Sequence, residues 1–450
     1  RPLTFVGVTG TELHQAALIF NGLLAGVCVY LAAVFGSRLG LSPRLSMLCA
    51  GMAALYPGVS ASSRIAWPET LLCVAVLASA IFAHDQTSRK NLFLGLLSGL
   101  LFCVHPRAIV VTVAVVVLSI VISAKRLRRS LLLGLLLGWS GSTILLFQTG
   151  TWQTARFNAA KEPKAILEIL VSGVGQITAV GISSAGLAVI GVFLSFGAMS
   201  RVLRRKPYTG RDVATSVYLG IGFICIIALG GVTLAGSDRI DTAVYGRYVD
   251  PWVLPFAIVA VASLKTRVTK SQLWQLVWTL GAGVTIMGFA MSGLEDPARR
   301  IMTLSTGWLW EITNQVTIFT LFMAAIALFI VTIVRSFPSA STLLLSGVFL
   351  LSSAGSTIAN HTHLAEVGQI AEGQFSTAAF LPKNVSCLSH DVATTKSYAP
   401  SLYQLALPQV QHRRLDIAAA EVPCSAYLIA GLSLSDKCPN AELIATEKRG

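Results

Sequence analysis

The octapeptide Ser62-Ser63-Arg64-Ile65-Ala66-Trp67-Pro68-Glu69 lies between two apolar segments and places an arginine and a carboxylate at the mouth of a membrane helix. Ionisable side chains at membrane depth are costly, so each one is a functional hypothesis. The alternative is a plain helix start, since Pro68 suits a first turn and Glu69 complements the helix dipole. The stretch predicts a membrane helix that begins beside a candidate site.

Composition supports the same class. The chain has 450 residues, of which 54% are hydrophobic and 12% are charged, and its mean hydropathy is +0.71. A soluble domain has about 25% charged residues. We therefore expect an all-α polytopic membrane protein. The net charge of +14 is explained by basic loops that set topology, and no nucleic-acid partner is expected.

The apolar runs predict about twelve transmembrane helices. The candidate spans are residues 16–36, 45–59, 66–83, 91–104, 108–123, 131–147, 177–199, 213–236, 252–264, 273–293, 316–334 and 342–358. Residues 152–175 are expected to lie as an amphipathic helix on the outer surface.

Basic residues gather in alternate loops, as a cytoplasmic face requires. They are Arg38, Arg44, Arg89, Lys90, Lys125, Arg126, Arg128, Arg129, Arg201, Arg204, Arg205, Lys206, Arg211, Lys265, Arg267, Lys270 and Arg335. The octapeptide and the polar tail then lie on the extracytoplasmic side. The first residue is Arg1, and a chain that begins in the cytoplasm needs one more span before it. We therefore expect an upstream segment.

Two further clusters fall on the outer side. His105-Pro106-Arg107 tips a short hairpin, where the arginine either grips a lipid-linked phosphate or extends to the headgroups. Tyr245-Gly246-Arg247-Tyr248 precedes a later helix, and its tyrosines either stack on a sugar or form an aromatic belt. We predict that Arg64, Glu69, Arg107 and Arg247 converge on one outward-facing cavity.

The polar tail is predicted to be a separate domain. Residues 1–358 form the transmembrane module, N-terminally incomplete, and residues 359–450 form a small extracytoplasmic α/β domain. Residues 425–430 read as one strand. Three cysteines lie in this tail, and we predict that Cys387 pairs with Cys424 or Cys438 in an oxidising compartment.

Several classes of enzyme are not indicated. The chain has no Walker A loop, no Rossmann glycine fingerprint and no HExxH motif. His361-Thr362-His363 with Glu366 is a weak ligand set, and no metal site is predicted from it. The cofactor is left open, with a divalent cation as the candidate.

The three clusters together resemble the GT-C superfamily of integral-membrane glycosyltransferases. That group includes protein O-mannosyltransferases, lipid A aminoarabinose transferases and actinobacterial mannosyl- and arabinosyltransferases. The resemblance covers roughly residues 1–358. It is carried by residues 63–69, by the hairpin from Gly95 to Arg107 and by Gly246-Arg247-Tyr248 before Pro251.

The resemblance implies an inverting hexosyl or pentosyl transfer from a polyprenyl-phosphate sugar on the outer face of the cell membrane. The acceptor is a glycan, lipid or protein of the envelope. Arg64, His105, Arg107, Tyr245, Arg247 and Tyr248 would bind substrate. Glu69 would be an assisting acid, because the family's principal base lies in a first outer loop of which this chain holds only the end.

Two other functions are compatible with the sequence. A lipid or polysaccharide transporter or flippase also has many spans and buried charges, although no internal repeat is visible here. A non-enzymatic envelope assembly protein would use the tail to bind a partner.

Overall fold

A computed structural model of the chain describes residues 10–65, 68–122, 124–149, 166–203, 210–235, 245–264, 281, 305, 332, 336–337, 340–373, 381–382, 384–391, 403, 407–417, 423–425 and 428–429. The chain divides into two compact units. One holds residues 21–361, and the other holds residues 362–450 together with residues 1–20.

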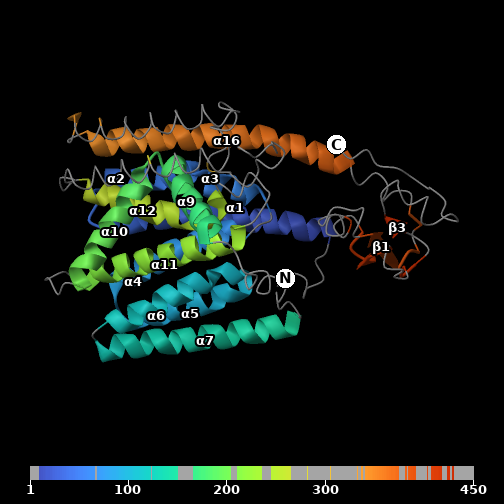
Figure 1. Ribbon diagram of the computed structural model, residues 1–450, viewed down its shortest axis with the longest axis horizontal. Helices are drawn as coiled ribbons and strands as arrows, with labels where there is room; N and C mark the ends of the chain where they lie inside the picture. The colour runs from blue at the N-terminus through green and yellow to red at the C-terminus, as the bar shows by residue number, and fades with distance from the viewer. Residues whose placement is uncertain are drawn as a thin grey trace. The chain divides into compact units, whose positions relative to one another are not determined.

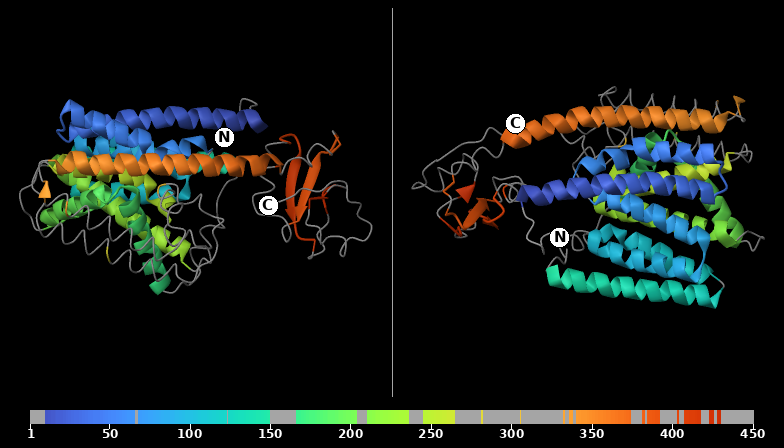
Figure 2. Two further views of the ribbon diagram at one scale, coloured as in Figure 1. Left: turned by 90° about the horizontal axis from the view of Figure 1, so that it is seen from above. Right: turned by 180° about the vertical axis from the view of Figure 1, so that it is seen from behind.

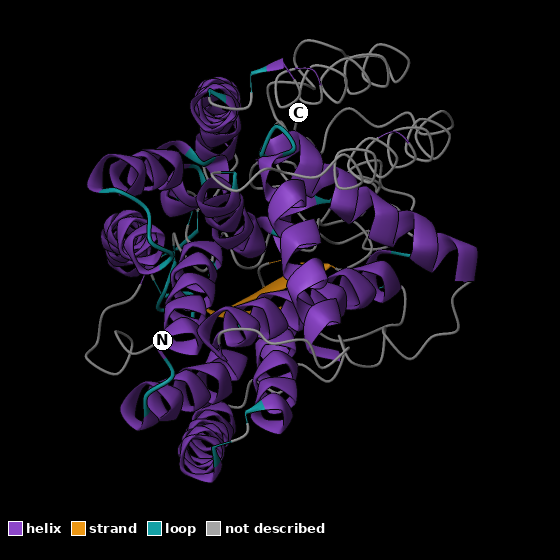
Figure 3. Cartoon of the chain, turned by 90° about the vertical axis from the view of Figure 1, so that its left-hand side faces the viewer, coloured by secondary structure: helices purple, strands orange, loops and turns teal. Residues whose placement is uncertain are grey.

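The described chain is mostly helical, as the colouring of Figure 3 shows. The longer helices are α1 (Gly10–Arg38), α2 (Pro43–Leu55), α4 (Glu69–Asp85), α5 (Ser88–Val104), α6 (Ile109–Val121), α7 (Lys125–Thr149), α9 (Ile166–Ser183), α10 (Leu187–Leu203), α11 (Gly210–Leu234), α12 (Asp250–Ser263) and α16 (Ser341–Gly373). The short turns are α3 (Pro57–Ser60), η2 (Ser62–Arg64), η3 (Pro106–Ala108) and η5 (Gly246–Tyr248).

This is a multi-pass membrane protein. Among the described residues, five helices are long and apolar enough to cross a membrane, or six if one bent pair counts as a single span. Large apolar side chains such as Phe20, Leu136 and Leu351 are exposed on these helices, as contact with lipid requires. The predicted spans 273–293 and 316–334 lie almost entirely outside the described residues, so the count of twelve stays a prediction.

The predicted span 45–59 is a broken helix. Helix α2 ends at Leu55, and Pro57 opens α3 at an angle of 53° to it. Tyr56 stands between them in an extended conformation, with φ −61° and ψ 122°. A residue before proline is pushed out of the helical region, which explains the break.

The prediction of a single span over residues 177–199 was wrong. Helix α9 ends at Ser183 and α10 begins at Leu187, so a turn interrupts the predicted span. In that turn Ala185 and Gly186 both have positive φ, and the Gly186 N–H donates to the carbonyl of Gly181 at 2.7 Å. This hydrogen bond closes the end of α9 in the manner of a left-handed helix cap. Residues 166–175, which we expected in a surface helix, belong to α9.

Helices α5 and α7 lie side by side with their backbones in contact (Figures 1 and 2). Both carry a pair of glycines four residues apart, Gly95 with Gly99 and Gly134 with Gly138. A Cβ atom on Gly134 would strike the carbonyl of Leu92, and one on Gly99 would strike the backbone of Trp139. Small residues at this spacing allow membrane helices to approach closely. The interface fixes α5, whose C-terminal end leads into His105 and Arg107.

The second unit contains a small parallel sheet. Its strands are β1 (Cys387–Asp391), β2 (Gln411–Leu415) and β3 (Leu428–Ile429), in the order β2-β1-β3. Strand β3 lies inside the segment 425–430 that the sequence predicts as a strand. A disulfide joins Cys387 to Cys424, which confirms the predicted pairing with one of its two candidates. The α/β character of the whole tail stays a prediction.

Candidate functional site

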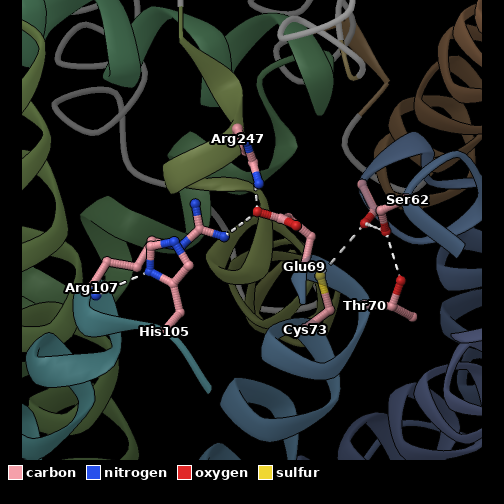
Figure 4. Close-up of polar contacts among 8 residues, drawn as sticks. Ser62, Glu69, Thr70, Cys73, His105, Arg107 and Arg247 are labelled. Carbon is pink, nitrogen blue, oxygen red and sulfur yellow. Dashed lines mark hydrogen bonds and ion pairs between the residues drawn. The ribbon is translucent and has the colours of Figure 1, made fainter. Parts of the chain in front are cut away.

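Glu69 is the first residue of α4. Pro68 precedes it without a side-chain cap, and a carboxylate in the first turn complements the positive end of the helix dipole. The preceding loop is fixed by Ser62, whose hydroxyl donates to the carbonyl of Gly58 at 2.6 Å and hydrogen-bonds the Thr70 hydroxyl at 2.9 Å. Figure 4 shows Ser62 and Thr70 beside the start of α4.

Arg107 sits at the tip of the α5–α6 hairpin. His105 leaves the helix in an extended conformation before Pro106, and its Nδ1 atom accepts the backbone N–H of Arg107 at 3.1 Å. Proline is favoured at this first position of the short turn η3. The turn is therefore braced locally, and the Arg107 side chain is buried with only 5% exposed.

Arg247 comes from a third segment. It lies in the middle of η5, directly before α12, and its side chain is 19% exposed. Tyr245 and Tyr248 flank it and pack edge to face, with their ring centroids 5.1 Å apart. Tyr245 is buried, and burial raises the pKa of its phenol, so it stays a hydrogen-bond donor.

The two arginines meet on one carboxylate oxygen. Arg107 Nη2 donates to Glu69 Oε1 at 2.6 Å, and Arg247 Nε donates to the same oxygen at 2.5 Å. Glu69 itself is 2% exposed. Figure 4 shows the carboxylate between the two guanidinium groups. These residues are separated by 38 and 178 positions in the chain, so only the fold brings them together.

The charges in this cluster are not balanced. Two guanidinium groups face one carboxylate, which leaves one positive charge among the three side chains. Within the described part of the chain, Glu69 Oε2 and the Nε and Nη1 atoms of Arg107 are buried and have no hydrogen-bond partner. Buried polar atoms without partners cost free energy, so the cluster is open to a ligand that supplies these atoms with hydrogen-bond partners.

The remaining sequence candidates divide into two groups. Tyr248 lies against the cluster, because the Arg107 guanidinium is 5.2 Å from the centre of its ring, within the range of a cation–π contact. Arg64 does not join it. Its side chain is exposed at the end of η2, and it makes no polar contact with the residues that the structure describes. Three of the four charged residues that we expected to converge therefore do so.

A second buried carboxylate, Asp250, lies close by, and its partners could not be predicted from the sequence. Tyr56 donates its hydroxyl to Asp250 Oδ1 at 2.7 Å, and the Ser305 hydroxyl donates to the same oxygen at 2.5 Å. Tyr56 stands at the break between α2 and α3. The Tyr56-Pro57 pair could have indicated this break, but not the hydrogen bond to Asp250. Asp250 follows η5 and makes no ion pair within the described residues.

No metal centre is visible in the described ranges, where no three His, Cys, Asp or Glu side chains lie close enough to share an ion. The predicted candidate, a divalent cation, stays a prediction. The arrangement that the structure presents is a buried, positively charged cluster on a carboxylate support.

No protein-family model matches the chain, and no curated protein matches it. Two solved structures are similar to it. One is the crystal structure of ArnT from Cupriavidus metallidurans bound to undecaprenyl phosphate, with a TM-score of 0.49 and 14% identity over 96% of this chain and 82% of that one. The other is the apo state of ArnT from the same organism, with a TM-score of 0.45 and 14% identity over 90% of this chain and 75% of that one.

ArnT is an aminoarabinose transferase of the GT-C family, the group that the sequence resembles. At this identity and TM-score, the likeness assigns no substrate and no residue role to the chain. Those must come from the geometry of its own residues.

Proposed function

We propose that this chain is a membrane glycosyltransferase that moves a sugar from a polyprenyl-phosphate donor to an envelope acceptor on the extracytoplasmic face. One observation carries the proposal. Arg107 and Arg247 are held together on a single oxygen of Glu69, and the Nε and Nη1 atoms of Arg107 are buried without partners among the described residues. A phosphate group supplies both the charge and the acceptor oxygens that these groups lack.

The arginines have a direct role in this chemistry. In the transfer, the acceptor oxygen loses its proton and bonds to the anomeric carbon, the bond from that carbon to the phosphate oxygen breaks, and the polyprenyl phosphate leaves with an additional negative charge. Positive groups that are fixed before the reaction stabilise charge that develops in the transition state. The Nε and Nη1 atoms of Arg107 lie on different edges of the guanidinium plane, and each can donate a hydrogen bond to a phosphate oxygen.

Glu69 supports the arginines. A carboxylate that neutralises one of two guanidinium groups lets them approach each other, and its hydrogen bonds orient both. We predicted Glu69 as an assisting acid, and that role stays a prediction. The geometry supports a positioning role for its Oε1 atom. Tyr245 and Tyr248 stand beside Arg247, where their rings can pack on a sugar.

The outward orientation rests on the alternation of basic loops in the sequence. The segments that carry Glu69, Arg107 and Arg247 alternate with these basic loops, so they fall on the opposite, extracytoplasmic face. A donor whose lipid tail lies in the bilayer would present its phosphate and sugar at that face.

The proposal is tested by transfer assays on the full-length protein in liposomes, with radiolabelled polyprenyl-phosphate mannose and polyprenyl-phosphate arabinose as donors. We expect Arg107→Ala and Arg247→Ala to lower the rate of donor cleavage by at least about 100-fold, since each removes a group that stabilises the transition state. Arg247→Lys should recover only part of the loss, because an ammonium lacks the planar fork.

Arg64→Ala is the matched control, because Arg64 is an exposed arginine next to the same loop. It should react at nearly the wild-type rate. Equal rates for the wild type and all four variants would contradict the proposal. Movement of intact donor between leaflets without cleavage of the sugar–phosphate bond would favour a flippase instead.

A further inference from the structure

The unpartnered atoms of the cluster are of opposite kinds. Arg107 has buried N–H groups at Nε and Nη1 that need acceptors, whereas Glu69 has a buried oxygen, Oε2, that needs a donor. A phosphate diester satisfies the first need, because it offers oxygens only. It cannot satisfy the second, because it carries no hydrogen to donate. Some other part of the bound ligand must therefore meet Glu69 Oε2.

That other part must lie close to the phosphate. The two side chains are locked to each other through Arg107 Nη2 and Glu69 Oε1 at 2.6 Å. The unpartnered nitrogens share the guanidinium carbon with Arg107 Nη2, and the unpartnered oxygen shares the carboxylate carbon with Glu69 Oε1. They therefore lie close to the contact between the two side chains. A ligand that satisfies both must present an acceptor and a donor in neighbouring positions.

A sugar joined to phosphate through its anomeric carbon has this pattern. The next ring carbon carries a hydroxyl in common sugars, or an acetamido N–H in amino sugars, and either one is a hydrogen-bond donor. We propose that Glu69 Oε2 accepts a hydrogen bond from the group on this carbon while Arg107 holds the phosphate. The inference rests on the proposed function and extends it, because it makes Glu69 a specificity-determining residue that selects donors with a hydrogen-bond donor beside the anomeric carbon.

The site should discriminate strongly between a donor and its 2-deoxy analogue, although the two differ by only one hydroxyl. A 2-deoxy donor would bury the carboxylate oxygen without a partner, and a site built around a substrate hydroxyl rejects the analogue that lacks it. We expect the 2-deoxy donor to bind at least about tenfold more weakly.

The test measures competition against radiolabelled polyprenyl phosphate on the full-length protein in nanodiscs. The competitors are polyprenyl-phosphate mannose, polyprenyl-phosphate arabinose and the 2-deoxy counterpart of each. For every protein the readout is the ratio of the two dissociation constants, 2-deoxy over parent. This ratio cancels any general effect of a substitution on phosphate binding or folding.

Wild-type protein should give a ratio of at least about ten for one or both sugars, and Glu69→Ala, which leaves no group that could bond the hydroxyl, should bring it close to one. The control is Asp85→Asn at the other end of α4, where another buried carboxylate is paired with Arg38 and Lys90. Asp85→Asn should keep the wild-type ratio.

The outcomes separate the inference from the proposed function. A wild-type ratio near one for both sugars would overturn the inference, and so would a high ratio that Glu69→Ala leaves unchanged. In both cases, loss of labelled polyprenyl phosphate binding in Arg107→Ala would still support the phosphate site. Binding of the label that is indifferent to Arg107→Ala would refute the proposed site and the inference together.

Discussion

Helix α5 takes part in two regions that are built on opposite principles. Along its length, Gly95 and Gly99 pack so closely against α7 that no side-chain atom can be added. Just beyond its end, Arg107 is buried with hydrogen-bond groups that the described chain does not satisfy. The first region is fully packed by the chain itself, whereas the second leaves polar atoms for which we propose a ligand. The comparison separates a region that is built for stability from a region that is open to binding.

The largest effect is expected at the packed region. Gly134→Leu would drive a side chain into the backbone of Leu92, and this overpacking should cost more than about 3 kcal/mol, enough to prevent recovery of folded protein. Gly26→Leu on α1 is the control, because a Cβ atom there meets nothing within 4 Å. Size-exclusion chromatography of both variants in detergent is the measurement. A monodisperse Gly134→Leu protein with the wild-type melting temperature would contradict the packing of α5 on α7.

At the Arg107 cluster, the expected effect is a rise in thermal stability when polyprenyl phosphate binds. Polyprenyl phosphate at about 100 times its dissociation constant should stabilise the folded protein by about 2.7 kcal/mol, visible as a higher apparent melting temperature. Arg107→Ala should lose this ligand-induced shift. Gly138→Ala should begin from a lower melting temperature, because its Cβ atom would meet the carbonyl of Leu96, but it should keep the shift.

Loss of the ligand-induced shift in Gly138→Ala, or its survival in Arg107→Ala, would mean that the two regions are not separable in this way.

The smallest effect is expected in the tail, where two histidine side chains on neighbouring strands form a hydrogen bond. His390 Nε2 and His412 Nδ1 are 3.0 Å apart, and His412 Nε2 also lies 3.2 Å from the carbonyl of Leu407. Burial lowers the pKa of His412 below its ordinary value. The unfolded chain then binds more protons than the folded one between the two pKa values, so stability is present above about pH 6.5 and declines below it.

His412→Gln should remove that part of the acid sensitivity. Thermal melts of the full-length protein from pH 7.5 to pH 5 would record it, with Arg413→Gln as the control, since Arg413 is an exposed neighbour on the same strand. Identical pH dependence in wild type and His412→Gln would show that the pair does not contribute.

The sequence predicts a good part of this fold because membrane helices end where charges and polar clusters begin. Residues 16–36 and 342–358, for example, fall inside α1 and α16. The prediction failed at Pro57 and at Ala185-Gly186, where the chain breaks a helix inside an apolar run. In both places hydropathy indicated one continuous span, and the local backbone signal was overlooked. Hydropathy averages over a window and does not see one residue with an extended or left-handed backbone.

The site shows a similar limit. Sequence order placed Glu69, Arg107 and Arg247 near the outer ends of separate spans, which is why they were singled out. It could not predict that they share one oxygen atom, or that Arg64 stays exposed and apart from them, because the contacts of a side chain in a turn depend on tertiary packing. Ser305 was missed altogether, because a lone serine carries no signal until the fold sets it beside Asp250.

The central claim is that Glu69, Arg107 and Arg247 form the binding site of a lipid-linked phosphate. The most direct test is a cryo-electron microscopy structure of the full-length protein with a polyprenyl phosphate added. The account predicts phosphate density in hydrogen-bond contact with the Nε or Nη1 atom of Arg107 and with the Arg247 guanidinium, with the lipid chain leading from it into the bilayer. Phosphate density elsewhere, with Arg107 still unpartnered on Glu69, would contradict it.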